Sequence, residues 1–203
     1  MGSLDYKNFQ TKIDEKKLKK LKTYYNLIKK WQNKFNLISK DSFDKIWERH
    51  FLDSYQIIKL IGNKKKILDI GSGAGFPAIV CAICSNNNFE LVESNKKKCI
   101  FLNEVKKVVG IKNIKIHNTR IENLKILKHF DYISARAVAP LDKLLKYCIK
   151  FYKSGMFCIF LKGKKFKEEI KLAEKKFIFN FKINKSITSK EGRILLIKNL
   201  KKK

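Results

Sequence analysis

The sequence predicts an α/β fold, in which a mostly parallel sheet carries helices on both faces and ends in an antiparallel strand pair. Three observations lead to this fold class. Strand-like and helix-like segments alternate from Lys66 onward. A buried strand, residues 66–70, runs directly into a glycine-rich loop and then a helix. The last two strand-like segments, 177–187 and 193–199, have no helix between them, so they should pair antiparallel at the sheet edge.

The chain begins with a helical region. Apolar residues recur at steps of three or four within residues 5–38, which predicts one helix. A second helix is predicted over 41–61, with Asp41 or Ser42 as its cap. The composition changes only at 62–66. We therefore expect a helical extension over residues 1–62 and an α/β core over 63–203.

The second predicted helix carries the polar residues Arg49, His50, Asp53 and Ser54. Arg49 and Asp53 are four positions apart, a spacing at which their side chains can pair. His50 lies between them, and a lone histidine is more often structural than catalytic.

The core is expected to alternate between strands and helices. Its predicted parallel strands are 66–70, 89–93, 114–117, 130–135 and 156–162. Its predicted helices are 77–85, 95–109, 120–128, 140–152 and 165–176.

The stretch KILDIGSGAGFP, residues 66–77, carries the clearest functional signal. Asp69 ends the strand, and glycines follow at positions 71, 73 and 75. A glycine has no Cβ, so the backbone turns tightly and approaches a ligand closely. The dinucleotide fingerprint would need a glycine at position 76, where Phe76 stands. The spacing is instead D-x-G-x-G-x-G, and its ligand should lie at the carboxyl edge of the sheet near a helix N-terminus.

An acidic residue at the end of the next strand strengthens this signal. Glu93 follows the loop by about 20 positions, where a carboxylate is placed to accept hydrogen bonds from ribose hydroxyls. Loop and acid together favour a nucleoside-containing cofactor over an ordinary strand-to-helix turn.

The net charge of +29 makes a polyanion the natural partner, with nucleic acid as the first candidate. An alternative is a lysine-rich composition without a dedicated binding face. Because lysine is the usual cation here, the four arginines (Arg49, Arg120, Arg136 and Arg193) mark places that need a planar guanidinium.

Other classes are disfavoured. No apolar run reaches the length of a membrane span, and no signal peptide is evident. The five cysteines form no disulfide framework, which suits reduced thiols, so we expect a cytoplasmic protein. Cys81 and Cys84 fall inside an apolar helix without a second pair, so we expect no metal site.

Several short motifs now form one ordered set: W-x-x-x-x-N-L from Trp31, R-H-x-x-D-S from Arg49, D-I-G-S-G-A-G-F-P from Asp69, T-R-I-E from Thr119, S-A-R-A-V-A from Ser134 and L-K-G from Leu161. Their order and spacing resemble the RsmG (GidB) family, the bacterial 16S rRNA guanine-N7 methyltransferases. The resemblance covers nearly the whole chain. It implies a Rossmann-like class I S-adenosylmethionine-dependent methyltransferase that acts on 16S rRNA or an assembling small ribosomal subunit. We expect the protein to be a monomer.

The resemblance also implies site residues. The cofactor S-adenosyl-L-methionine would be bound by Asp69, Gly71, Gly73, Gly75, Phe76, Glu93, Ile121, Glu122 and Arg136. Methyl transfer would involve Arg136 and Lys162, and RNA would contact His50, Arg120 and Lys162. Glu93 replaces the commoner aspartate of the family, but it keeps both acceptor oxygens.

Two alternatives stay open at this point. One is a class I methyltransferase that acts on another RNA or a small molecule. The other is a basic nucleic-acid-binding protein with an unused cofactor loop. Methylation of exocyclic amines is disfavoured, because the only prolines are Pro77 and Pro140 and the Pro-Pro loop typical of those enzymes cannot form.

Overall fold

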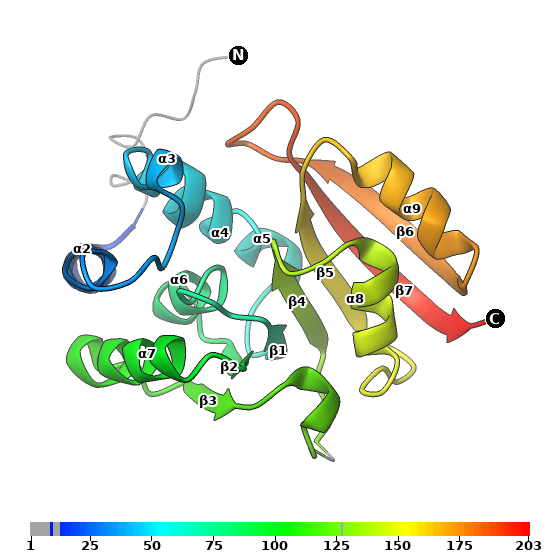
Figure 1. Cartoon of the computed structure of the whole chain (residues 1–203), viewed down its shortest axis with the longest axis horizontal. Coiled ribbons are helices and arrows are strands. Elements are labelled where there is room, and N and C mark those ends of the chain that lie inside the picture. Colours follow the sequence, from blue (N-terminus) through cyan, green and yellow to red (C-terminus); the bar gives the residue numbers. More distant parts are fainter. Residues whose placement is uncertain (1–8, 10–12, 127) are drawn as a thin grey trace.

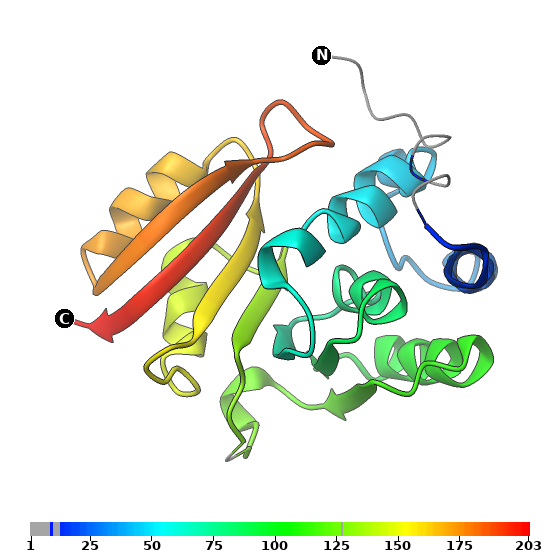
Figure 2. The same cartoon turned by 180° about the vertical axis from the view of Figure 1, so that it is seen from behind.

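The computed structural model describes residues 9, 13–126 and 128–203, and its centre is a seven-stranded sheet with the order β3-β2-β1-β4-β5-β7-β6 (Figures 1 and 2). The parallel strands are β1 (Lys66–Ile70), β2 (Asn88–Glu93), β3 (Ile114–Asn118), β4 (Tyr132–Arg136) and β5 (Phe157–Lys162). The last two strands are β6 (Phe177–Lys185) and β7 (Arg193–Lys202), and β7 runs antiparallel to both β5 and β6. The predicted fold class is confirmed.

Helices cover both faces of this sheet. The face toward the N-terminal region holds α6 (Ala78–Cys84) and α7 (Lys96–Val109), and the other face holds α8 (Leu141–Cys148) and α9 (Phe166–Glu174) (Figures 1 and 2). Strand β1 serves both layers, since Ile67 packs into the first hydrophobic cluster while Leu68 and Ile70 pack into the second. This double burial explains why Ile67, Leu68 and Ile70 are all apolar.

The N-terminal helix α2 (Glu15–Gln32) packs against α6 and α7. Asp14 caps it by accepting a hydrogen bond of 2.9 Å from the backbone N–H of Lys17. Farther along, Trp31 donates its indole N–H to Glu104 of α7 at 2.8 Å. The first residues of the predicted 5–38 helix lie partly outside the described residues.

The region predicted as one helix over 41–61 is broken. It consists of α3 (Lys40–Phe43), the π-helix η1 (Trp47–Leu52), α4 (Asp53–Tyr55) and α5 (Ile58–Ile61). The backbone N–H of Asp53 reaches the carbonyl of Glu48, five residues back. This wider turn rotates Asp53 relative to Arg49, and the Asp53 carboxylate pairs with Arg136 instead of the expected Arg49.

The helix predicted over 120–128 is also wrong. Only a 3₁₀ turn, η2 (Ile121–Asn123), forms there, and residue 127 lies outside the described residues. The ammonium group of Lys150 donates to the carbonyls of Glu122 at 2.7 Å and Leu124 at 3.0 Å. Those carbonyls are therefore satisfied without a helix.

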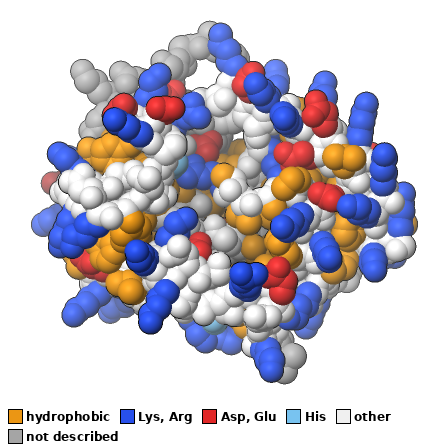
Figure 3. Space-filling model, viewed as in Figure 1, with side chains coloured by type: hydrophobic (Ala, Val, Ile, Leu, Met, Phe, Trp, Pro, Cys, Tyr) orange, Lys and Arg blue, Asp and Glu red, His pale blue; other side chains and the backbone are white. Residues whose placement is uncertain are grey.

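The boundary at residues 62–66 stays a prediction. Phe51 and Ile57 of the helical region share one hydrophobic cluster with Ile67 of β1. No helix in the described ranges is long and apolar enough to cross a membrane. Lys and Arg side chains are spread over the face seen in Figure 3 and gather at no single element.

Candidate active site

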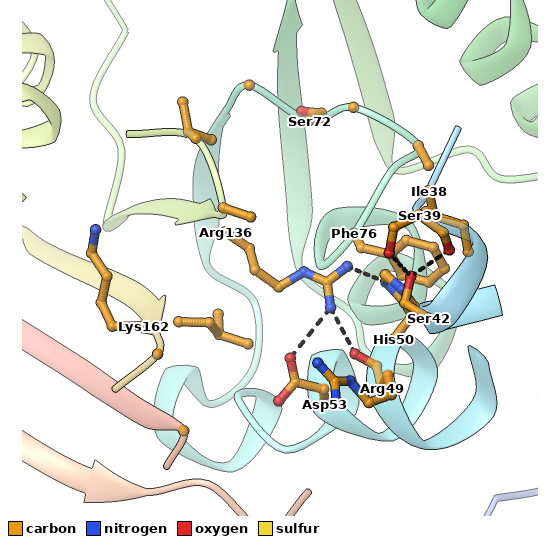
Figure 4. A pocket seen from close by; sticks show the side chains of 18 of the residues that line it. Ile38, Ser39, Ser42, Arg49, His50, Asp53, Ser72, Phe76, Arg136 and Lys162 are labelled. Atoms are coloured by element: carbon orange, nitrogen blue, oxygen red, sulfur yellow. Dashed lines mark hydrogen bonds and ion pairs between the residues drawn. The ribbon is translucent and has the colours of Figure 1, made fainter. Parts of the chain in front are cut away.

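A cavity of about 1010 Å³ opens at the carboxyl edge of the sheet, beside the ends of β1 and β4. The strand order reverses at this point, which is where open α/β sheets bind their ligands. One wall of the cavity is the glycine loop with Glu93. The opposite wall comes from η1 and the end of β4 (Figure 4), and the hairpin loop between β6 and β7 adds to it.

The three loop glycines share a positive φ but have different surroundings. A Cβ on Gly71 would lie 2.7 Å from Val138, and one on Gly75 would collide with Ile79. A Cβ on Gly73 would meet only the Gly71 carbonyl oxygen, at 3.8 Å. Gly71 and Gly75 are therefore required by the packing of the protein, whereas Gly73 leaves open space for close approach of a cofactor.

Glu93 lies directly against this loop. Its Oε2 accepts the backbone N–H of Gly73 at 2.8 Å, and its Oε1 accepts that of Asn95 at 2.8 Å. Each carboxylate oxygen has a second lone pair, so Glu93 still has acceptor capacity for ribose hydroxyls. The loop and this acid fit the nucleoside part of a cofactor.

Asp69 lies beneath the loop, fully buried. Ser134 donates its hydroxyl to Oδ1 at 2.6 Å, and Oδ2 has no hydrogen-bond partner among the described residues. Burial raises the pKa of Asp69 from its ordinary value of 3.8 to about 7. Asp69 thus supports the cavity from below, while the loop residues form its surface.

Arg136 is the centre of the opposite wall. Its guanidinium donates to the carbonyl of Arg49 at 3.0 Å, to Asp53 Oδ2 at 3.3 Å and to His50 Nδ1 at 2.5 Å (Figure 4). It also lies over the ring of Phe76, 5.1 Å from the centroid. Burial lowers the pKa of Arg136, and the charge of Asp53 opposes that effect. Three partners in different directions require a planar fork of donors, which lysine lacks.

The contact with Arg136 fixes the state of His50. A guanidinium has no acceptor, so Nδ1 of His50 must accept and Nε2 must carry the ring proton. Burial, with the charges of Arg136 and Arg49, lowers the pKa of His50 from 6.5 to about 3. His50 is therefore neutral near pH 7, and its basic nitrogen is occupied.

Lys162 lies in the same cavity, at the end of β5. Its ammonium group donates to the carbonyl of Ala139 at 2.8 Å and to Glu169 Oε2 at 2.6 Å. Glu169 also accepts the backbone N–H of Leu141 at 2.8 Å. Lys162 is thus a held cation, with a side chain only 8% exposed.

Three residues that the family resemblance implies lie outside the cavity wall. Arg120 and Glu122 are exposed, and Ile121 packs into the second hydrophobic cluster. They follow β3, whose last residue, Asn118, donates its side-chain amide to the Glu93 carbonyl at 3.1 Å. Their contact with cofactor or RNA stays a prediction.

The hairpin loop, for which the sequence predicts no role, contributes Ser186, Thr188 and Ser189 to the cavity. Thr188 and Ser186 bind Asp53 through their hydroxyls, at 2.8 Å and 3.4 Å. Asp53 stood in the R-H-x-x-D-S motif, so it could have been proposed as a site residue. The loop has no comparable signal in the sequence.

Comparison with solved structures identifies the class of fold. The chain resembles a putative S-adenosyl-L-methionine-dependent methyltransferase of Methanococcus maripaludis, with a TM-score of 0.59, 17% identity, and 73% of this chain and 84% of the other covered. It also resembles an S-adenosylmethionine-dependent methyltransferase of Aquifex aeolicus, with a TM-score of 0.58, 14% identity, and coverage of 71% and 88%. The fold is that of the S-adenosylmethionine-dependent methyltransferases.

Sequence comparison identifies the family. Residues 17–198 match the GidB family, described as rRNA small subunit methyltransferase G. The chain is 39% identical to the ribosomal RNA small subunit methyltransferase G of Rickettsia akari, covering 91% of this chain and 95% of that protein. It is 38% identical to the protein of the same name from Rickettsia prowazekii, covering 94% and 98%. This chain belongs to the GidB family, and the predicted cofactor, S-adenosylmethionine, is confirmed at that level.

Proposed function

We propose that the protein, acting as a monomer in the cytoplasm, transfers a methyl group from S-adenosylmethionine to guanine N7 in the decoding-region loop of 16S rRNA. One observation carries the choice of atom: every described carboxylate and imidazole that lines the cavity already has a partner. His50 and Asp53 accept hydrogen bonds from Arg136, Glu93 accepts from the backbone of the glycine loop, and Glu169 accepts from Lys162.

Guanine N7 suits a cavity without a free base. The bound cofactor supplies an electrophilic methyl group. N7 presents a lone pair on the major-groove face of the base and carries no proton that must leave. The protein therefore needs only to hold the extruded base in line with the methyl group. An exocyclic amine would lose a proton during the reaction, whereas the imidazole and the carboxylates that line the cavity are each already engaged by a donor of the protein.

The position of each residue determines which part of the cofactor or the RNA it would contact. Glu93 and the open side of Gly73 hold the ribose end of the cofactor, with Ile121 and Glu122 toward the adenine. Arg136 and Lys162 orient the guanine and its phosphates from the ends of β4 and β5. His50 and Arg120 contact the RNA, His50 from inside the cavity and Arg120 from the surface beyond Glu93.

Mapping of methylated nucleotides by mass spectrometry tests the proposal. Small subunits from cells lacking the protein would be incubated with it and S-adenosylmethionine. We expect one new 7-methylguanosine, in the decoding-region loop, and none with a Gly73→Val variant that fills the cofactor approach. Methylation of another RNA, of another atom, or of no nucleotide would overturn the assignment.

A pH–rate profile tests the absence of a general base. With cofactor and RNA saturating, the single-turnover rate should vary little below about pH 7. A tenfold rise per pH unit in that range, abolished by His50→Asn or Glu169→Gln, would contradict this chemistry.

A further inference from the structure

The hairpin loop between β6 and β7 is tied to α4, although the two segments are far apart in the sequence. Thr188 donates its hydroxyl to Asp53 Oδ1 at 2.8 Å, across 135 residues. The backbone N–H of Ile187 reaches the side-chain carbonyl of Gln56 at 2.9 Å, and the amide of Gln56 donates to Ser186 at 3.1 Å. The loop is therefore fixed by side chains of the N-terminal region.

Asp53 connects this loop to the centre of the site. While Oδ1 accepts from Thr188, Oδ2 accepts from the Arg136 guanidinium at 3.3 Å. The side chains of Arg136 and Asp53 are only 14% and 18% exposed, so solvent screens their interaction little. One carboxylate thus holds the loop with one oxygen and the guanidinium with the other.

The other partners of Arg136 cannot replace this contact. The Arg49 carbonyl and His50 Nδ1 are neutral acceptors, and Asp53 is the one carboxylate among the described hydrogen-bond partners of the guanidinium. Hydrogen bonds between ionised groups are the stronger and more directional ones. The position of the Asp53 carboxylate, which Thr188 and Gln56 hold, therefore sets the rotation of the guanidinium plane.

We propose that Asp53 is a positioning residue, through which the hairpin loop 186–188 holds the Arg136 guanidinium in its working orientation. The consequence for methyl transfer rests on the proposed function. The coupling itself rests only on the contacts above.

A double-mutant cycle tests the coupling in the full-length protein. Thr188→Val removes the loop hydroxyl, Asp53→Asn removes the charge, and the third variant combines both. With RNA and cofactor saturating, we expect single-turnover losses of about fivefold for Thr188→Val and about twentyfold for Asp53→Asn. The double variant should lose no more than Asp53→Asn alone, because the loop acts through that carboxylate.

The controls separate positioning from general stability. Thr188→Ser keeps the hydroxyl and should stay within about twofold of the wild type. Asp142→Asn removes a carboxylate that pairs with Lys176 at 2.6 Å, outside the cavity, and it should leave the single-turnover rate unchanged. Losses that multiply in the double variant would mean that loop and Arg136 act independently, which would overturn the proposal.

A second readout does not depend on methyl transfer. The chain has four arginines, so its side-chain Nε–H signals in a ¹⁵N spectrum are few, and the one lost in Arg136→Lys belongs to Arg136. We expect Thr188→Val to shift that signal in the wild-type background and to leave it unmoved in the Asp53→Asn background. An unmoved signal in both backgrounds would refute the coupling. A shifted signal with no methylation of 16S rRNA would refute the proposed function and support the role of Asp53.

Discussion

The two walls of the cavity are built in different ways. The glycine-loop wall comes from residues 69–93, and its main polar contact joins Glu93 to a backbone N–H only 20 positions away. The Arg136 wall joins segments that are 83 and 135 positions apart, and in both of these contacts a side chain binds a side chain. The first wall depends on the shape of the backbone and on glycines, which have no side chain. The second depends on charged side chains that meet only after the chain has folded.

This difference predicts different responses to salt, and the largest expected effect is on RNA binding. A chain of net charge +29 that neutralises several phosphates releases counterions, so RNA affinity should fall about a hundredfold or more between about 50 and 200 mM salt. Affinity for S-adenosylhomocysteine, held by local contacts at the loop wall, should change by less than about twofold. Parallel titrations of both ligands measure this, and a flat RNA curve would refute the electrostatic interpretation.

The second prediction compares two glycines within the loop wall. Gly75→Ala combines a positive φ with a collision against Ile79, so unfolding should become easier by about 2–5 kcal/mol. Gly73→Ala meets open space and should cost only about 1–2 kcal/mol, from its backbone conformation. Urea denaturation measures both.

The two variants should rank in the opposite order in cofactor binding, where Gly73→Ala should have the larger effect. S-adenosylhomocysteine should raise the melting temperature of the wild type, because it binds only the folded state. That rise should nearly vanish in Gly73→Ala, whose new methyl group fills the cofactor approach. If Gly75→Ala and Gly73→Ala lowered the free energy of unfolding equally, the proposed difference between the two glycines would be wrong.

The same difference explains what the sequence could predict. The loop, its strand and Glu93 follow from hydrophobic pattern and glycine spacing within about 25 residues, and these are the elements that local rules describe. The π-helix was not predicted, because a periodicity of three to four steps does not reveal one extra residue in a turn. The docking of Thr188 on Asp53 depends on strand order and on the hairpin geometry, which no local pattern specifies.

The third prediction removes the planar fork from the Arg136 wall. Arg136→Lys keeps the charge but cannot reach the Arg49 carbonyl, Asp53 and His50 together. The single-turnover rate should fall about thirtyfold, while RNA affinity changes by less than about threefold, because the net charge is unchanged. Filter binding and single-turnover assays on the same preparations separate the two effects. Wild-type turnover in the variant would show that methyl transfer does not depend on the planar fork of Arg136.

The smallest predicted effect concerns pH, since each wall buries one group, Asp69 or His50, whose shifted pKa makes stability depend on pH below about pH 7. Asp69 under the loop has a pKa of about 7 when folded and 3.8 ordinarily, so the folded state binds an extra proton between these values. Its contribution to the free energy of unfolding therefore falls as pH rises from about 4 to 7. His50 has a pKa of about 3 when folded and 6.5 ordinarily, so the unfolded state binds the extra proton. Its contribution rises over about pH 3 to 6.5.

In the wild type these two slopes oppose each other between about pH 4 and 6.5, so single variants should reveal them. His50→Asn keeps an acceptor near Arg136 but does not titrate. As pH rises, its free energy of unfolding should therefore fall relative to the wild type, by up to about 1.4 kcal/mol per pH unit. Asp69→Asn keeps an acceptor for Ser134, and relative to the wild type its stability should rise with pH by a similar amount. Urea denaturation at several pH values in this range measures both differences. Two variants that both run parallel to the wild type would mean that neither wall buries a group with a shifted pKa, and curves that diverge in opposite directions would assign one shifted group to each wall.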